Sequence, residues 1–149
     1  ADLMSFGGTK NGCLGAEAIV VFEPGRFANL RLIRQRAGHV VSKARFVAAQ
    51  FEGYLADGGW LETAAHANAM AARLSAGIRA NGATRLAWES QANELFPVLP
   101  RAIIARLRAA GATFYEWPAD GVGDDEDCVR LVTSFATSEA EVDRFLSLL

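Results

Sequence analysis

The residue best suited to chemistry in this sequence is Lys10, which lies in the run Ser5-Phe6-Gly7-Gly8-Thr9-Lys10-Asn11-Gly12. A lysine amine attacks carbonyl carbons and forms Schiff bases when its surroundings favour the neutral form. Glycines near it let the backbone approach a flat ligand, because they carry no Cβ atom. The run therefore predicts either a lysine that reacts with a carbonyl group or a surface turn with an exposed lysine, and spacing alone favours the turn.

Three other patterns resemble known sites but lack their defining residues. The run Gly7-Gly8-Thr9-Lys10 is not a phosphate-binding P-loop, because no glycine directly precedes the lysine and Asn11 follows it. The acidic run 120–127 lacks the spacing and terminal glutamate of an EF-hand, so we expect a solvated hairpin loop there. His39 and His66 have no partner that the sequence identifies, and we expect both to be structural. We expect no metal site.

The composition is ordinary for a globular protein. Of its 149 residues 51% are hydrophobic, and the formal net charge of −2 predicts no surface for nucleic acid. No apolar run approaches the ~18 residues of a membrane span, and no signal peptide is visible. Cys13 and Cys128 form no CxxC pair, and free thiols suit a reducing compartment. We therefore expect a cytoplasmic protein with no nucleic-acid or membrane partner.

The elements that position Lys10 are predicted to be a strand and long helices. Residues 16–22 form a compact apolar run with β-branched side chains, which predicts a buried strand. Residues 26–81 contain no proline and are typical of helix, with a break at Asp57-Gly58-Gly59. Asn81-Gly82 predicts a left-handed cap at the end of the second helix. Close packing of that helix against another helix or subunit is indicated by its apolar positions, Trp60, Ala64, Ala67, Ala71, Leu74 and Ile78.

The rest of the chain predicts a small α/β unit with the element order β-β-α-β-β-α. A helix begins at Pro100 and ends at Gly111, and the last helix opens with the capping box Ser138-Glu139-Ala140-Glu141. This order predicts a mainly antiparallel sheet with helices on one side. We expect short strands over residues 85–88, 95–99, 112–117 and 129–135.

Four segments resemble those of a known family. Residues 2–12 resemble the cofactor-lysine segment of low-specificity threonine aldolases and related β-eliminating lyases, and residues 34–46 resemble the segment that follows this lysine. Residues 64–71 resemble the interdomain helix of the family, and residues 129–134 resemble its C-terminal arginine strand. The matches are in the family's order and cover nearly the whole chain. These enzymes depend on pyridoxal phosphate and have the aspartate-aminotransferase fold, fold type I.

The resemblance implies two roles at the cofactor. Lys10 matches the residue that forms a Schiff base with pyridoxal phosphate, and Thr9 lies beside the cofactor. Many members carry Gly-Gly-Gly-Met-Arg-Gln, whose arginine reaches the cofactor phosphate of a neighbouring subunit. This chain has Gly38-His39-Val40-Val41-Ser42-Lys43 there, with Ser42 in place of the arginine. Lys43 or Arg45 could supply the missing charge, and a solvated helix face is the alternative for either residue.

A third role implied by the resemblance concerns the substrate. Arg130 matches an arginine that binds the substrate α-carboxylate, a task that suits its planar fork of N–H donors. The alternative is an exposed strand residue that faces the acidic run 124–127.

The implied fold class is α/β, the C-terminal part of a fold-type I enzyme. Residues 1–40 would be a remnant of the cofactor-binding large domain, residues 41–83 the interdomain helices, and residues 84–149 the small domain. In the family, the aspartate that pairs with the pyridine nitrogen precedes the lysine, whereas nine residues precede Lys10 here. We therefore expect this chain to require an N-terminal portion of the same enzyme and to assemble as a homo-oligomer, a dimer or tetramer.

The implied reaction is cleavage of a threonine-type β-hydroxy-α-amino acid to glycine and an aldehyde. Two alternatives stay open. The same fold could catalyse β-elimination or transamination, which Lys10 and Arg130 would serve equally well. The chain could also be a non-catalytic fragment that binds no cofactor.

Overall fold

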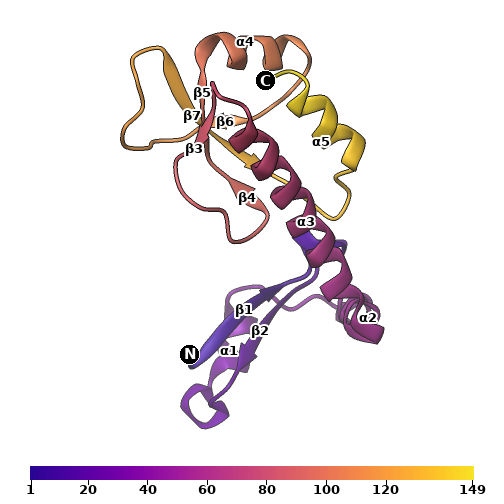
Figure 1. Ribbon diagram of the computed structural model, residues 1–149. Coiled ribbons are helices and arrows are strands. Elements are labelled where there is room, and N and C mark those ends of the chain that lie inside the picture. Colours follow the sequence, from indigo (N-terminus) through magenta and orange to yellow (C-terminus); the bar gives the residue numbers. More distant parts are fainter. The chain divides into compact units, whose positions relative to one another are not determined.

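The computed structural model describes residues 1–149, which form two compact units, Ala1–Thr63 and Ala64–Leu149. Helix α3 (Gly59–Ala80) contributes its first turn to the first unit and the rest to the second. Figure 1 shows the order of the elements along the chain. None of the helices has the length and apolar character needed to cross a membrane.

The first unit is built on a β-hairpin (Figure 1). Strand β1 (Leu3–Gly7) pairs antiparallel with β2 (Glu17–Val21), and the loop between them contains the 3-10 helix η1 (Thr9–Asn11). The N–H of Gly8 donates to the Ala16 carbonyl at 2.8 Å and closes the loop. Lys10 therefore lies at the closed end of the hairpin.

Helical segments follow the hairpin, as the composition predicts, but in shorter pieces. They are η2 (Pro24–Phe27), α1 (Leu30–Arg36), α2 (Ala44–Leu55) and η3 (Ala56–Gly58). Gly38, with φ 75°, follows the end of α1. The predicted break at residues 57–59 is confirmed, because Asp57 (φ 51°) and Gly58 (φ 78°) are left-handed there.

The prediction of a buried strand over residues 16–22 is wrong in its burial. The strand forms, yet Ile19 is 60% exposed and Phe22 is 54% exposed, while Ala16 is buried. Strand β2 pairs only with β1, and this two-stranded sheet is covered only in part, by aromatic side chains that pack around Phe6. An apolar run predicts a strand, but its burial depends on what packs against it.

The second unit has an antiparallel sheet centred on β7. Strand β6 pairs with β7, and both β4 and β5 pair with β7 in a single register. The sequence predicts one strand over residues 95–99, whereas the structure has two short strands, β4 and β5, in this region. The interruption precedes Pro97, which has no N–H to donate to the ladder. The bounds are β3 (Arg85–Leu86), β4 (Glu94–Leu95), β5 (Pro97–Pro100), β6 (Tyr115–Glu116) and β7 (Glu126–Val132).

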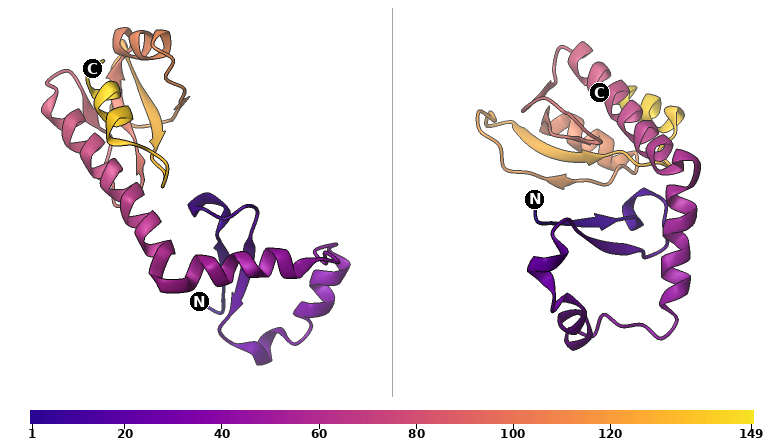
Figure 2. Two further views of the ribbon diagram at one scale, coloured as in Figure 1. Left: turned by 90° about the vertical axis from the view of Figure 1, so that its right-hand side faces the viewer. Right: turned by 90° about the horizontal axis from the view of Figure 1, so that it is seen from below.

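Helices cover one face of this sheet, as predicted. Helices α3, α4 (Arg101–Ala109) and α5 (Glu139–Leu146) pack on that face (Figures 1 and 2). The opposite face carries a smaller cluster of Phe96, Val98 and Cys128 to which no helix contributes. The main core consists of Met70, Ala71, Leu74, Ile78, Leu95, Leu99, Ile103, Ile104, Leu107, Val129, Leu131 and Val142.

Local signals for the ends of helices are confirmed in two of three cases. The capping box forms, because the Ser138 hydroxyl accepts from the Glu141 N–H and the Glu141 carboxylate accepts from the Ser138 N–H. Gly111 (φ 94°) follows α4. The left-handed cap at Gly82 is wrong: Gly82 has no positive φ, and the Asn81 side chain instead accepts from the Ala83 N–H at 2.9 Å.

Candidate functional site

Lys10 has an exposed side chain in a turn whose shape is set by glycines. A Cβ atom on Gly7 would lie 2.3 Å from a carboxylate oxygen of Glu17, and one on Gly8 would lie 2.6 Å from Sγ of Cys13. Gly12 adopts a φ of 117°, a conformation that L-residues rarely adopt. The glycines around Lys10 therefore serve the hairpin itself, and they leave the amine at its tip.

Asn11 fastens this turn to the helices of the first unit. Its side-chain amide donates to the Tyr54 hydroxyl at 2.7 Å and to the Trp60 carbonyl at 2.9 Å. The rings of Phe6, Phe51, Tyr54 and Trp60 pack together with centroids 5.9 to 6.5 Å apart. The sequence did not single out Asn11, because its partners lie 43 and 49 residues away.

Thr9 and Lys43, the other two residues predicted to lie at the cofactor, are also in the first unit. Thr9 is exposed, and its hydroxyl donates to the Ala16 carbonyl at 3.5 Å. Lys43 is the exposed N-cap residue of α2. Arg45, the alternative cation, lies over the ring of Phe46 at 4.7 Å. The Lys43 side chain makes no capping hydrogen bond to α2.

Arg130 extends from β7 in the second unit, where it is opposite Tyr115 of β6. Its Nε donates to the Glu94 carboxylate, and its guanidinium carbon lies 5.6 Å from the centre of the Trp117 ring. The alternative in which Arg130 faces residues 124–127 is wrong, because Glu94 of β4 is its partner. The acidic run is paired elsewhere, with Asp127 bound to Arg101 at 3.0 Å.

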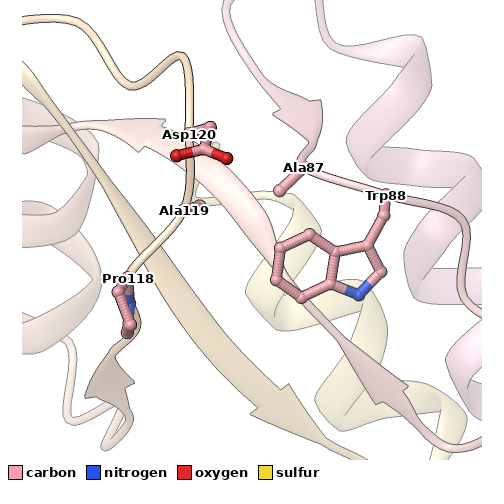
Figure 3. Close-up of a pocket in the computed structure, with 5 residues that line it drawn as sticks. All are labelled: Ala87, Trp88, Pro118, Ala119 and Asp120. Atoms are coloured by element: carbon pink, nitrogen blue, oxygen red, sulfur yellow. The ribbon is translucent and has the colours of Figure 1, made fainter.

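Aromatic side chains continue from Trp117 across this face of the sheet. The Trp117 ring lies 5.5 Å from that of Phe96, which lies 4.5 Å from that of Trp88. An open pocket of about 380 Å³ adjoins Trp88. Figure 3 shows the Trp88 ring and the Asp120 carboxylate on separate segments around it, with Ala87, Pro118 and Ala119.

The two histidines make contacts that support the fold. His66 Nε2 lies 2.7 Å from the Thr137 carbonyl oxygen, which joins α3 to the segment before α5. The carbonyl of His39 accepts from Arg34 Nε at 2.9 Å, just after α1. Neither imidazole is placed by these contacts beside Lys10 or Arg130.

The comparisons with known proteins agree in pointing to one family. The chain is 35% identical over 141 residues, 95% of its length, to the low specificity L-threonine aldolase of Pseudomonas sp. (strain NCIMB 10558). It is 37% identical over 120 residues to the low specificity L-threonine aldolase of Pseudomonas aeruginosa. A solved structure of the Leishmania major threonine aldolase is 36% identical over 99% of the chain, with a TM-score of 0.89. The chain belongs to the threonine aldolase family.

The match covers only part of each threonine aldolase. The chain spans 39% and 35% of the two curated relatives and 42% of the Leishmania protein. A serine palmitoyltransferase from Sphingomonas wittichii, 18% identical with a TM-score of 0.70, shares the fold, which is that of fold-type I enzymes. No model of a protein family matches the sequence.

The residues of the Lys10 turn fit pyridoxal phosphate, on which threonine aldolases generally depend. The cofactor carries an aldehyde, and an exposed primary amine is the group that reacts with it. The Thr9 hydroxyl and the Lys43 ammonium are donors suited to a phosphate. Asn11 holds the turn through two hydrogen bonds, and the Lys10 side chain is exposed.

Proposed function

We propose that this chain is the lysine-bearing part of a pyridoxal-phosphate enzyme that cleaves threonine-type β-hydroxy-α-amino acids to glycine and an aldehyde. The observation that carries the proposal is the exposed Lys10 at the tip of a fixed hairpin, in a chain 35% and 37% identical to two low-specificity L-threonine aldolases. Lys10 and Lys43 are the only lysines of the chain, and Lys10 is the one that matches the cofactor-lysine segment of the family.

Three residues are proposed to bind the cofactor. Lys10 binds its aldehyde carbon, Thr9 donates a hydroxyl beside it, and Lys43 supplies a positive charge to its phosphate. The chemistry that bound pyridoxal phosphate would supply is an electron sink for the pair released when a bond to Cα breaks. The protein's part is to hold the reacting groups in place and to shield them from water.

Arg130 is proposed to bind the α-carboxylate of the substrate. Its side chain is 35% exposed, so a small anion can reach it. Two parallel N–H donors fix both the position and the direction of a carboxylate. With the carboxylate held, Arg130 would restrict the orientations of the substrate in the site, which favours cleavage of one bond at Cα over the others.

We propose that the active enzyme contains further polypeptide besides this chain and at least two subunits. The chain spans 35% to 42% of its relatives, and the first unit exposes large apolar side chains that a partner surface would cover. These include Leu14, Ile19, Phe22, Leu32, Ile33 and Phe46. We propose a cytoplasmic homo-oligomer, a dimer or tetramer, in which the rest of the enzyme packs on this surface.

Product analysis of the gene product with L-threonine tests the reaction. Aldol cleavage predicts glycine and acetaldehyde in equal amounts, and β-elimination predicts a 2-oxo acid and ammonia. Transamination predicts the 2-oxo acid that retains the β-hydroxyl, with no glycine. Lys10→Arg should abolish glycine release, whereas Lys43→Arg, which keeps the charge, should retain it. Glycine release that is unchanged in Lys10→Arg would exclude the proposed role, and a non-catalytic fragment predicts no product at all.

A further inference from the structure

The Arg130 guanidinium is held on two sides while its outer edge is free. Its Nε donates to Glu94, and its guanidinium carbon lies over the ring of Trp117, 5.6 Å from the ring centre. Its two terminal nitrogens make no hydrogen bond within the chain. An arginine has five N–H donors in a rigid fork, so a single bond at Nε leaves the terminal pair available.

We infer that Glu94 and Trp117 are positioning residues, which hold Arg130 so that its two terminal N–H groups receive a carboxylate. This inference rests on the proposed carboxylate-binding role of Arg130. A carboxylate next to Arg130 can act in two ways. It can compete with the substrate carboxylate for the guanidinium, or it can hold the guanidinium in place for that carboxylate, and we infer the second role for Glu94.

The fold supports the two contacts from opposite edges of β7. Glu94 lies on β4, which pairs with one edge of β7, and Trp117 follows β6, which pairs with the other. The backbone N–H of Trp117 donates to the Cys128 carbonyl at 2.8 Å, and the centre of its ring lies 5.5 Å from that of Phe96. Trp117 is therefore fixed by neighbours other than Arg130.

Fixing Arg130 before a ligand arrives should strengthen binding. A free arginine side chain has many rotamers, and part of this rotamer entropy is lost when a ligand immobilises the side chain. If Glu94 and Trp117 already restrict the side chain, a carboxylate loses less on binding. The negative charge of Glu94 acts in the opposite direction, because it weakens the attraction of Arg130 for an anion.

A matched pair of variants separates these two effects of Glu94. Glu94→Gln and Glu94→Ala both remove the charge, but only glutamine keeps an oxygen that accepts from Arg130 Nε. We would measure acetate binding to the full chain from its 15N-labelled arginine side-chain signals, at constant ionic strength with chloride as the replaced anion. Glu94→Gln should bind acetate about two- to fivefold more tightly than Glu94→Ala, the effect expected of one half-exposed hydrogen bond.

A second pair tests Trp117. Trp117→Phe keeps an aromatic face beneath the guanidinium, and Trp117→Leu keeps apolar volume without one. Trp117→Leu should bind acetate about two- to fivefold more weakly than Trp117→Phe, as expected for loss of a cation–π contact at a partly exposed site. The backbone amide spectra of all four variants confirm that each is folded.

The outcomes separate this inference from the proposed function. Acetate binding that is equal in Glu94→Gln and Glu94→Ala, or tighter in Glu94→Ala, would overturn the positioning role of Glu94. If the wild-type chain does not bind acetate, the role of Arg130 itself fails. The Nε–H signal of Arg130, assigned by its loss in Arg130→Lys, then still tests positioning without ligand. It should be sharp in the wild type and Glu94→Gln and broadened by exchange in Glu94→Ala, and equal line widths would contradict the inference.

Discussion

At the scale of single residues, the proposed site depends on polar side chains whose partners are distant in sequence. Lys10 was found from the sequence because its glycines and its family resemblance are local. Asn11 and Glu94 were not, since their partners lie 36 to 49 residues away and no local pattern records such contacts. The sequence predicts Trp60 on an apolar helix face, but no local pattern predicts that Phe51, Tyr54 and Trp60 pack around Phe6.

Asn11 provides a prediction about how firmly the Lys10 turn is held. Asn11→Ala removes both donors to Tyr54 and Trp60, which should cost about 1–2 kcal/mol of local stability. Hydrogen exchange of the amides of residues 8–14 should become about five- to thirtyfold faster. Asn29→Ala is the control, because Asn29 caps α1 without a side-chain hydrogen bond. Equal exchange rates in the two variants would mean that Asn11 does not hold the turn.

Carboxylates that accept hydrogen bonds in the second unit predict how its stability changes in acid. The Arg85 guanidinium holds the pKa of Glu126 below the ordinary value of 4.5, Arg73 lowers the pKa of Asp143, and the Ser138 N–H lowers the pKa of Glu141. Because these pKa values are lower in the folded protein than in the unfolded chain, the unfolded chain binds more protons in acid.

The stability that these carboxylates contribute is therefore present above pH 4.5 and is lost as the pH falls through the folded-state values. The melting temperature of the second unit should fall between pH 5 and pH 3, about the range in which free carboxyls titrate. Glu126→Gln should have a lower melting temperature than the wild type at pH 7 and a flatter pH profile. A wild-type profile that is flat over this range would exclude the account.

At the scale of elements, local signals predicted most helix ends and strand positions. The capping box at Ser138, the break at Asp57 and the stop at Gly111 are confirmed, because each depends on a few adjacent residues. The exposure of β2 was missed, since it depends on what packs against the sheet. The interruption before Pro97 was missed although its cause, the missing N–H of the proline, is local. The close packing predicted for the second helix is confirmed by Gly77, which leaves no room for a Cβ beside Leu146 of α5.

Gly77 provides a prediction about this contact between α3 and α5. A Cβ on Gly77 would lie 2.4 Å from the methyl carbons of Leu146, so Gly77→Ala should cost about 1–3 kcal/mol through overpacking. Gly53→Ala, in the open part of α2, should instead stabilise its helix by about 0.5–1 kcal/mol. Hydrogen exchange of α3 and α2 measures the two effects separately.

A second variant shows whether Leu146 is the cause. In a Leu146→Ala background the space beside Gly77 opens, and the added Gly77→Ala should then cost nothing further or stabilise α3 through its better helix propensity. If Gly77→Ala destabilises the protein equally in both backgrounds, the contact with Leu146 is not the reason for the glycine.

At the scale of the whole molecule, the two units differ in how much apolar surface they bury. The buried hydrophobic residues lie in the second unit, with the exception of Ala16. The first unit bears the proposed cofactor lysine but exposes large apolar side chains, including Leu14 at 91% and Phe46 at 64%. We therefore propose that cofactor binding requires the rest of the enzyme or a second subunit to cover the first unit.

This difference predicts unequal stability along the chain. Native-state hydrogen exchange should show high protection for the core amides of Ala64–Leu149 and low protection throughout Ala1–Thr63, because burial of apolar surface is the main source of stability. Limited proteolysis should accordingly cut within the first sixty residues before it cuts the second unit. Equal protection in the two units would contradict this account.

The most direct test of the central claim is reduction of the full chain with borohydride in the presence of equimolar pyridoxal phosphate, followed by peptide mapping. The added mass should lie on Lys10 in preference to Lys43 and the N-terminal amine. Lys10→Arg should lose most of it, and Lys43→Arg should retain it. Label shared equally between Lys10 and Lys43, or retained in full by Lys10→Arg, would contradict the assignment of Lys10 as the cofactor lysine.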